Sequence, residues 1–386
     1  MTEQRTRVVV VGGGYAGVIA ANHLQLRPDI EITLVNPRAE FVERIRLHQL
    51  VTGSDDATVA YADVLGPRVR LVVDTTTRID PAARRVHLAD GDPLPYDYLI
   101  YAVGSGAATP TVPGAAEFGY PIADLEQARR LTAVLDAAPP GAPICVVGGG
   151  LTGIETAAEL ADRGRAVTLV CGAVLAPGLS GPGRRSVTRR LRALGVEIVE
   201  GSAVAAVAAH AVTLDDGHRL PSAVTIWTAG FGVPDLAARS GLRTDAIGRL
   251  LTDETLTSVD DDRIVAAGDA AAPSGAPLRM SCQAALPLGA QAANTVLARL
   301  EGNPPAAVNQ AFTGQCISLG RRAGTIQIAR TDDTPLPLYL GGRAGAAIKE
   351  AVCKATVSFL RREARKPGSY FWLKGGTRPS AEAARR

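Results

Sequence analysis

The chain has 386 residues, of which 46% are hydrophobic, so it is long enough for two or three domains with sizeable cores. Its net charge of only +3 argues against a nucleic-acid-binding protein. The five cysteines are scattered and odd in number, which argues against a secreted disulfide framework and a paired redox dithiol. Because neither a secretory signal nor an apolar stretch of about 18 residues is recognisable, we expect a cytoplasmic protein.

The N-terminal segment has the pattern of a βαβ unit. The apolar run Arg7–Val11 is typical of a buried parallel strand. It leads into the hexapeptide GGGYAG at residues 12–17, a helix expected from Tyr15 to Leu26, and a strand expected at Ile30–Val35. In this context the G-x-G-x-x-G spacing is a dinucleotide fingerprint. Its first glycine permits the tight turn, its second lets the backbone approach a pyrophosphate, and its third lets the helix pack on the strand.

The same plan recurs later in the chain. A strand expected at Ile144–Val147 leads into GGGLTG at residues 148–153, followed by a helix at Leu151–Arg163 and a strand at Ala166–Val170. A βαβ unit repeated at this distance indicates two homologous nucleotide-binding domains rather than a solenoid. The sequence therefore predicts an α/β fold with two Rossmann-like dinucleotide-binding domains.

The rest of the chain is assigned around these two units. Further strands are expected at Val69–Ile79, Arg85–Leu88, Leu94–Tyr101, Val196–Leu214 and Ala223–Trp227, and a helix from Ser281 to Leu300 with Pro287 in its first turn. We expect the first domain at residues 1–118 and 246–308, the second at 119–245, and a small C-terminal α+β region at 309–386. The Gly-Gly-Thr-Arg-Pro-Ser segment at 375–380 is expected to be flexible.

Both fingerprints lack the acidic residue that usually binds the adenosine ribose about 20 residues further on. Asn36 stands there in the first unit and Cys171 in the second. Asn36 can still hydrogen-bond a ribose, whereas Cys171 removes a charge that would repel a 2′-phosphate. Arg184 and Arg185 follow soon after, either as phosphate ligands or as solvent-exposed residues. The sequence thus leaves the choice between NADH and NADPH open.

Three more motifs follow in a fixed order, YLIYAVG at residues 98–104, TIWTAG at 225–230 and IVAAGD at 264–269. With the two fingerprints, they make residues 7–300 resemble the two-dinucleotide-binding-domain flavoproteins of the pyridine nucleotide-disulfide oxidoreductase-like superfamily. Within it, the sequence resembles the branch of type II NADH:quinone oxidoreductases and apoptosis-inducing-factor-like NAD(P)H oxidoreductases. The resemblance implies FAD in the first domain and NAD(P)H in the second.

The resemblance also implies the cofactor-binding residues. For FAD they are Gly12, Gly14, Tyr15, Ala16, Gly17, Asn36, Arg46, Thr76, Ala102, Gly104, Gly268, Asp269, Ala284 and Ala285, and for NAD(P)H they are Gly148, Gly150, Thr152, Gly153 and Gly230. By this resemblance Asp269 would hold the ribityl chain, Thr76 would meet the adenine through its backbone, and Arg46 with nearby His48 would approach the pyrophosphate. The helix start at 284–285 would point at the flavin pyrimidine ring. A helix N-cap for Asp269 and an ordinary charged loop for Arg46 and His48 are the alternatives.

Glu155 is the candidate catalytic residue. It follows the second fingerprint by two residues, so we expect it in the first turn of the helix, where a carboxylate complements the helix dipole. The resemblance implies that this glutamate lies where the nicotinamide meets the flavin, and dipole complementation alone is the alternative. Because no His, Cys and carboxylate cluster has metal-ligand spacing, no metal site is expected.

The implied activity is that of an FAD-dependent NAD(P)H oxidoreductase. A hydride passes from NAD(P)H to flavin N5, and electrons then pass to a quinone-like acceptor. The alternatives are a soluble flavin-dependent tailoring oxidoreductase acting on a small aromatic or polyene metabolite, and a redox-sensing flavoprotein that acts through a protein partner. A disulfide reductase is excluded because the helix after the first fingerprint and the following segment lack cysteine.

The C-terminal region is basic, with eleven Lys or Arg residues and three Glu from Arg343 onward. Its predicted helix has an apolar face formed by Ile348, Val352, Ala355, Phe359 and Leu360, with Lys349 and Glu350 assigned to the polar face and the aromatic sequence YFWL following at 370–373. Such a helix could bind the inner face of the cell membrane peripherally. Docking on the protein's own flavin domain, or a homodimer contact, is the alternative that the modest apolar face favours.

Overall fold

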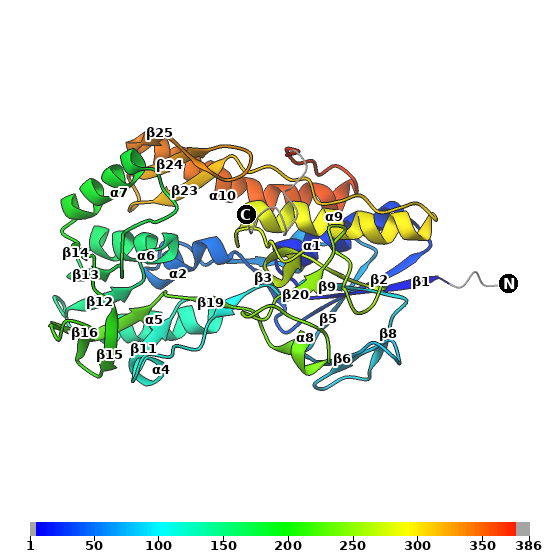
Figure 1. The fold of residues 1–386 in the computed structure, drawn as a ribbon, viewed down its shortest axis with the longest axis horizontal. Coiled ribbons are helices and arrows are strands. Elements are labelled where there is room, and N and C mark those ends of the chain that lie inside the picture. Colours follow the sequence, from blue (N-terminus) through cyan, green and yellow to red (C-terminus); the bar gives the residue numbers. More distant parts are fainter. Residues whose placement is uncertain (1–4, 376–386) are drawn as a thin grey trace.

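The computed structural model describes residues 5–375 and contains two five-stranded parallel sheets (Figure 1). The first has the strand order β21-β9-β1-β2-β5, with β1 at Thr6–Val11, β2 at Ile30–Asn36, β5 at Val69–Val73, β9 at Tyr98–Tyr101 and β21 at Ile264–Ala266. The second has the order β11-β18-β12-β13-β14, with β11 at Gly119–Pro121, β12 at Ile144–Val147, β13 at Val167–Val170, β14 at Glu197–Val199 and β18 at Val224–Trp227. The predicted α/β fold with two Rossmann-like halves is confirmed, and each fingerprint strand, β1 or β12, lies in the middle of its sheet.

A helix follows each fingerprint at the expected residue, α1 at Tyr15–His23 and α6 at Leu151–Asp162. Helix α1 is buried on all sides because α9, at Cys282–Leu300, covers it. A Cβ atom added to Gly289 would lie 2.2 Å from the Ala16 carbonyl oxygen, so glycine at this position lets the two helices approach closely. This packing holds the first fingerprint rigidly against its sheet.

The chain crosses between the two halves twice. Strand β10 (Gly106–Ala107) leaves the first half and β19 (Phe231–Gly232) returns from the second, and the two strands pair antiparallel. In Figure 1, β19 lies between the two halves. These crossings directly follow the motifs at residues 98–104 and 225–230.

Smaller elements complete the halves. The short strands are β3 (Glu40–Val42) paired with β4 (Thr58–Ala60), and β20 (Leu250–Thr252) paired with β22 (Ala271–Pro273). The remaining helices before the C-terminal region are α2 (Leu47–Val51), α3 (Tyr61–Val64), α4 (Ala115–Phe118), α5 (Leu125–Ala137), α7 (Gly181–Ala193) and α8 (Leu236–Arg239), with 3-10 turns η1 (Leu24–Leu26), η2 (Arg44–Arg46) and η3 (Gly268–Ala270).

Three expected strands are wrong because each is divided by a turn. The segment 69–79 becomes β5 and β6 (Thr76–Asp80), the latter in a separate antiparallel sheet with β7 (Arg85–Leu88) and β8 (Leu94–Pro95). The carboxylate of Asp74 accepts hydrogen bonds from the backbone amides of Thr75 and Ala89, and these bonds fix the turn between β5 and β6. The segment 94–101 likewise becomes β8 and β9, and the segment 196–214 becomes β14, β15 (Val204–Ala208) and β16 (Ala211–Leu214). Strands β15 and β16 form an antiparallel sheet with β17 (Arg219–Pro221).

Pro287 lies in the second turn of α9, not in the first, because this helix begins at Cys282. At that position the missing N–H would otherwise bond within the helix.

The C-terminal region joins both halves. Its antiparallel sheet, β23 (Gly314–Ser318), β24 (Gly324–Ala329) and β25 (Pro335–Gly341), packs on α6 and α7, while α10 (Gly342–Arg365) crosses to α1 and α3 (Figure 1). Val357 and Leu360 are buried in the same core as α1 and α9. The tail helix therefore docks on the protein's own first half, which was the favoured alternative to membrane binding. Its outer face still exposes Ile348 and Val352, each by 38%.

The aromatic segment at 370–373 folds back on this helix. The Tyr370 ring lies 5.5 Å from the Phe359 ring and stacks on Trp372, whose indole N–H donates to Asn309 Oδ1. The predicted flexible segment at 375–380 lies outside the described residues beyond Gly375. Across residues 5–375, no helix is both long and apolar enough to span a bilayer.

Candidate functional site

Each fingerprint brings the start of a helix to the carboxyl edge of its sheet, and neither helix has a side-chain cap. A Cβ atom added to Gly14 would meet no described atom within 4 Å, whereas one added to Gly17 would lie 1.8 Å from the Gly12 carbonyl oxygen. Gly150 and Gly153 have the same two kinds of surroundings. The second glycine thus leaves room for a pyrophosphate at the amide-rich helix terminus, and the third permits contact between helix and strand.

Asp269 lies at the carboxyl edge of the first sheet, just after β21. Its Oδ2 accepts a hydrogen bond of 2.7 Å from Ser105 Oγ and lies 3.7 Å from Nη1 of Arg44. Its Oδ1 is buried and finds no hydrogen-bond partner among residues 5–375. A buried carboxylate oxygen in this state suits a hydroxyl donor such as that of a ribityl chain. The N-cap of the adjoining turn η3 is Ala267, so Asp269 is not its cap.

Several other predicted FAD residues converge on the same edge. Gly268 has φ +69°, and a Cβ atom there would lie 2.9 Å from the Cβ of Ala16. Ala102 follows β9, and its carbonyl oxygen would lie 2.3 Å from a Cβ atom added to Gly12. Gly104, with φ +71°, lies in the loop just beyond. The tertiary structure therefore brings together residues from three separate parts of the sequence.

Asn36 ends β2, and Thr76 follows the neighbouring strand β5. Asn36 Oδ1 accepts the Gly13 amide at 3.0 Å, and its Nδ2 donates to the Arg38 carbonyl oxygen at 2.9 Å. The amide of Asn36 thus supports the fingerprint turn itself. The Thr76 hydroxyl, at the start of β6, is buried and has no hydrogen-bond partner in the described part of the chain. Thr76 therefore offers a buried hydroxyl as well as its backbone to a ligand.

The aromatic ring of Tyr15 packs edge-on against Phe41, with ring centroids 5.1 Å apart. At the start of α9, the Ser281 hydroxyl accepts the Ala284 amide at 3.2 Å and caps the helix, so Ala284 and Ala285 lie in its first turn. The neighbouring Cys282 is half-buried, and desolvation raises the pKa of its thiol. Cys282 is therefore a neutral thiol rather than a nucleophile.

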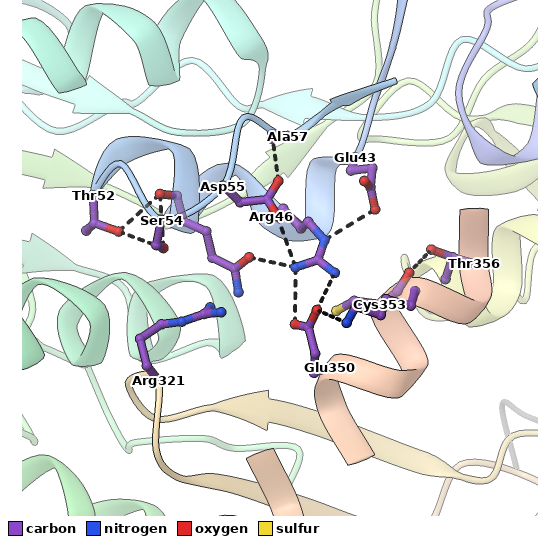
Figure 2. A network of polar contacts seen from close by, with 12 residues as sticks. Glu43, Arg46, Thr52, Ser54, Asp55, Ala57, Arg321, Glu350, Cys353 and Thr356 are labelled. Carbon is purple, nitrogen blue, oxygen red and sulfur yellow. Dashed lines mark hydrogen bonds and ion pairs between the residues drawn. The ribbon is translucent and has the colours of Figure 1, made fainter. Parts of the chain in front are cut away.

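Arg46 is held by other side chains (Figure 2). Its guanidinium donates to both carboxylate oxygens of Glu350, at 3.1 and 3.2 Å, and to Gln49 at 2.8 Å, and it lies 3.4 Å from both Glu43 and Asp55. Burial opposes its charge, but the hydrogen bonds that it donates to Glu350 raise the pKa of Arg46. Arg46 thus ties the loop before α2 to α10, and its predicted contact with the flavin pyrophosphate stays a prediction.

The second site has the same plan around β12 and α6. Thr152 lies in the first turn of α6 and Gly230, with φ +83°, follows β18. Cys171 and Glu200 lie side by side at the carboxyl edge, because Val170 and Val199 before them are paired in register. Glu200 Oε1 accepts the Leu175 amide at 2.7 Å. Burial, aided by the charge of Glu200, raises the pKa of the Cys171 thiol to about 12.

Glu155 lies in the second turn of α6, not the first as expected, because this helix begins at Leu151. Its side chain is 9% exposed, and its Oε1 accepts the Ser318 amide at 2.9 Å and the Lys349 ammonium at 3.0 Å. Its Oε2 lies 3.8 Å from Nδ1 of His48. The cluster unites α2, α6, the end of β23 and α10.

Charge within this cluster is set by pairing. Burial opposes ionisation of Glu155, but attraction to Lys349 and His48 lowers the pKa of this carboxyl. Burial likewise opposes the charge of Lys349, yet the charge of Glu155 raises the pKa of this ammonium. Burial lowers the pKa of His48 to about 4, so at neutral pH a neutral imidazole adjoins an ammonium–carboxylate pair. Nε2 of His48 is buried without a hydrogen-bond partner among the described residues.

Lys349 is the main residue that sequence reasoning missed, since it was assigned to the polar face of the tail helix. Its side chain is only 13% exposed. A signal was present in the spacing, because Cys353, Val357, Leu360 and Ala364 continue from Lys349 at helical intervals and all four are buried. The apolar face predicted through Ile348 and Val352 placed Lys349 on the polar face instead.

Two Rossmann-like halves, an open pyrophosphate position in each, and the buried acceptor atoms at Asp269 and Thr76 fit one dinucleotide per half. This arrangement defines the class of NAD(P)H-dependent flavoprotein oxidoreductases. The chain belongs to the pyridine nucleotide-disulphide oxidoreductase family, whose model matches residues 6–292. This family typically binds FAD and NAD(P)H.

Relatives of the chain include NADH dehydrogenase-like proteins and quinone oxidoreductases. It is 32% identical over 345 residues to an NADH dehydrogenase-like protein of Mycobacterium tuberculosis, covering 82% of this chain and 86% of that protein. It is 27% identical over 352 residues to the type II NADH:quinone oxidoreductase Ndh of the same organism, covering 78% and 74%. The sulfide:quinone oxidoreductase of Aquifex aeolicus has the same fold, with a TM-score of 0.80 at 20% identity, covering 97% of this chain and 100% of that one.

Proposed function

We propose that this protein passes electrons from NADH, through FAD, to a quinone-like acceptor. The observation that carries the proposal is the buried Lys349–Glu155 pair, which joins the second fingerprint helix to the C-terminal helix. Lys349 also acts electrostatically on Cys282 at the start of α9, as does Asp269. Lys349 and Asp269 therefore both lie within electrostatic range of the start of α9.

The residues have separable tasks in this proposal. The α1 amides and Gly14 would hold the FAD pyrophosphate, Asp269 the ribityl chain, and the Thr76 hydroxyl and backbone the adenine side. Bound FAD supplies the two-electron chemistry between the nicotinamide and the acceptor. The fixed positive charge at Lys349 Nζ would stabilise negative charge that develops on an acceptor carbonyl oxygen.

The choice of NADH rests on Glu200. Cys171 cannot serve as the ribose carboxylate, but Glu200 reaches the same edge from the adjacent strand, and only its Oε1 accepts a backbone amide. A carboxylate there favours a ribose hydroxyl and repels a 2′-phosphate. Arg184 lies in the first turn of α7 and would favour NADPH if it reached the same position.

A quinone as acceptor is supported by the relatives, two of which are named quinone oxidoreductases. Peripheral membrane contact is a further part of the proposal. The outer surface near the start of α10 exposes Ile348 and Val352, and the preceding strand β25 exposes Leu338 by 61% and Leu340 by 44%. Lys354, on the same helix, has a side chain that is 72% exposed. Exposed apolar residues with lysine beside them suit an anionic membrane surface.

The decisive experiment is an anaerobic titration of the FAD-loaded protein with NADH and with NADPH, followed by a screen of acceptors. We expect NADH to bleach the yellow flavin absorbance rapidly, and menadione or a ubiquinone analogue to restore it with steady turnover. Flavin that stays reduced with every quinone, together with a change of oligomeric state, would replace this proposal with a redox sensor. Turnover restricted to non-quinone aromatic or polyene compounds would replace it with a tailoring enzyme.

A further inference from the structure

A cavity of about 370 Å³ opens beside the Lys349–Glu155 pair, and no residue of either fingerprint lines it. Its walls come from α2, the loop between β23 and β24, and the first turns of α10. The inner wall includes Gln49, Ser318 and Lys349. Each of the three also contacts the Glu155 or Arg46 cluster. The cavity thus lies where both halves meet the C-terminal region.

The lining is strongly cationic. Arg321, Arg322, Arg343 and Lys349 face a single carboxylate, that of Glu350. Glu350 is already paired with Arg46 and Lys354. Arg321, whose side chain is drawn in Figure 2, lies 3.7 Å from Glu159. The guanidinium groups of Arg322 and Arg343 make no hydrogen bond or ion pair with any residue in 5–375. Like charges around one concavity repel each other unless an anion lies between them.

The start of α10 adds to this field. Arg343, Ala346 and Ala347, in its first two turns, line the cavity. The helix has 24 residues, no side-chain cap and no acidic residue in its first turn. The side of these first two turns therefore lines the cavity, close to the positive end of the helix dipole.

We propose that this cavity binds a small compound with two or more carboxylate or phosphate groups. Its volume lies near the lower end of ligand pockets, roughly 300–1,000 Å³, which suits a compound of the size of citrate. Arg322 and Arg343 would hold the anion at the mouth, and the Lys349 ammonium would attract its inner end. Because Lys349 also binds Glu155, an anion in the cavity would compete for the ammonium and weaken that pair. Binding of the anion would thereby be coupled to the site that we assign to the flavin.

Citrate is the probe for the test, measured by titration calorimetry on the FAD-loaded protein at constant ionic strength. ADP-ribose at saturation fills the second fingerprint, so that citrate cannot bind there. We compare the wild type with the double variant Arg322→Ala, Arg343→Ala. The matched control is Arg189→Ala, Arg192→Ala, which removes two exposed arginines from α7.

We expect the wild type and the control to bind citrate alike, and the Arg322/Arg343 variant to bind it at least roughly tenfold more weakly. Equal affinity in all three proteins, or no binding to the wild type, overturns the proposal. Steady-state kinetics then distinguish two sources of the anion. Competition between citrate and the acceptor assigns the site to an acidic group of the acceptor, and binding without competition assigns it to a separate effector.

Because the readout is binding, this result does not depend on the acceptor. A protein that binds citrate at the arginines but fails to reduce quinones would retain this site and lose only the proposed function.

Discussion

The ammonium of Lys349 lies 3.0 Å from the carboxylate of Glu155, and both side chains are largely buried between α10 and α6. Two charges taken out of water need each other, because removal of either one leaves the other without compensation. The C-terminal helix is therefore coupled electrostatically to the second fingerprint helix. This coupling makes α10 part of the buried cluster around Glu155 rather than an appended tail.

Lys349→Met should destabilise the protein by about 3 kcal/mol, since it leaves Glu155 as a buried charge beside neutral His48. Urea unfolding of the FAD-loaded protein measures this. The matched control is Lys354→Met on the same helix, whose lysine side chain is 72% exposed and should contribute little. Equal losses of unfolding free energy in the two variants would show that the buried pair contributes no more to stability than the exposed lysine.

The pH dependence of that difference follows from the two pKa shifts. The pKa of Glu155 is lowered on folding, so its contribution is present above its ordinary value of 4.5 and is lost as the pH falls through the folded value. The pKa of Lys349 is raised, so its contribution is present below 10.5 and is lost as the pH rises through the folded value. The gap between wild type and Lys349→Met should thus be widest between pH 4.5 and 10.5.

His48 should make the protein sensitive to mild acid. Burial lowers its pKa from 6.5 to about 4, so its neutral form is fully compatible with folding above pH 6.5 and stability is lost as the pH falls toward 4. Over that interval the loss should reach about 1.4 kcal/mol per pH unit. His48→Gln should flatten this part of the stability profile, and an unchanged slope would show that another group titrates there.

Asp269→Ala should reduce FAD affinity by roughly 10- to 100-fold, because the carboxylate offers its unpaired Oδ1 to the cofactor. The measurement is the FAD content of the purified protein, followed by titration of the apoprotein with FAD. Ser105→Ala is the comparison, since Ser105 donates only to Oδ2 and should weaken binding less. A larger effect of Ser105→Ala would place the ribityl contact elsewhere.

Glu200→Gln should reduce the preference for NADH over NADPH by roughly tenfold, through KM rather than kcat. Calorimetric titration with ADP-ribose and its 2′-phosphate provides a readout independent of turnover. Glu197→Gln on the same strand, whose carboxylate accepts the Thr168 hydroxyl instead, is the matched control. If only Arg184→Ala changes the preference, Arg184 as a phosphate ligand, and not Glu200, selects the nicotinamide cofactor.

Ile348→Glu, Val352→Glu should abolish sedimentation with anionic liposomes while leaving the fold intact, because both residues are exposed on α10. Circular dichroism and FAD content serve as folding controls. Deletion of residues after Gly342 is not an equivalent test, since it would uncover the core around Val357 and Leu360. Sedimentation that persists in the double variant would point to another contact surface.

The elements that were predicted well depend on short stretches of chain. The strands beginning at Arg7 and Ile144, the two fingerprints and both helix starts follow from local glycine geometry and runs of apolar residues. The failures at 69–79, 94–101 and 196–214 are also local. Pro95 and Gly201 mark two of the breaks, but the turns at residues 74–75 and 209–210 contain neither proline nor glycine. Apolar alternation continues through such turns, so it cannot reveal where pairing moves to another sheet.

The α/β architecture, the two nucleotide fingerprints and the order of the crossing motifs can be read from the sequence, because each depends on residues close together in the chain. The contacts of Lys349 with Glu155, of Arg46 with Glu350 and of Glu200 with Cys171 became visible only in the folded protein. Those pairings join distant segments, and their charges become meaningful only once folding removes them from water. A lysine on a solvated basic tail and a lysine in a buried ion pair look alike in the local sequence, and burial distinguishes them.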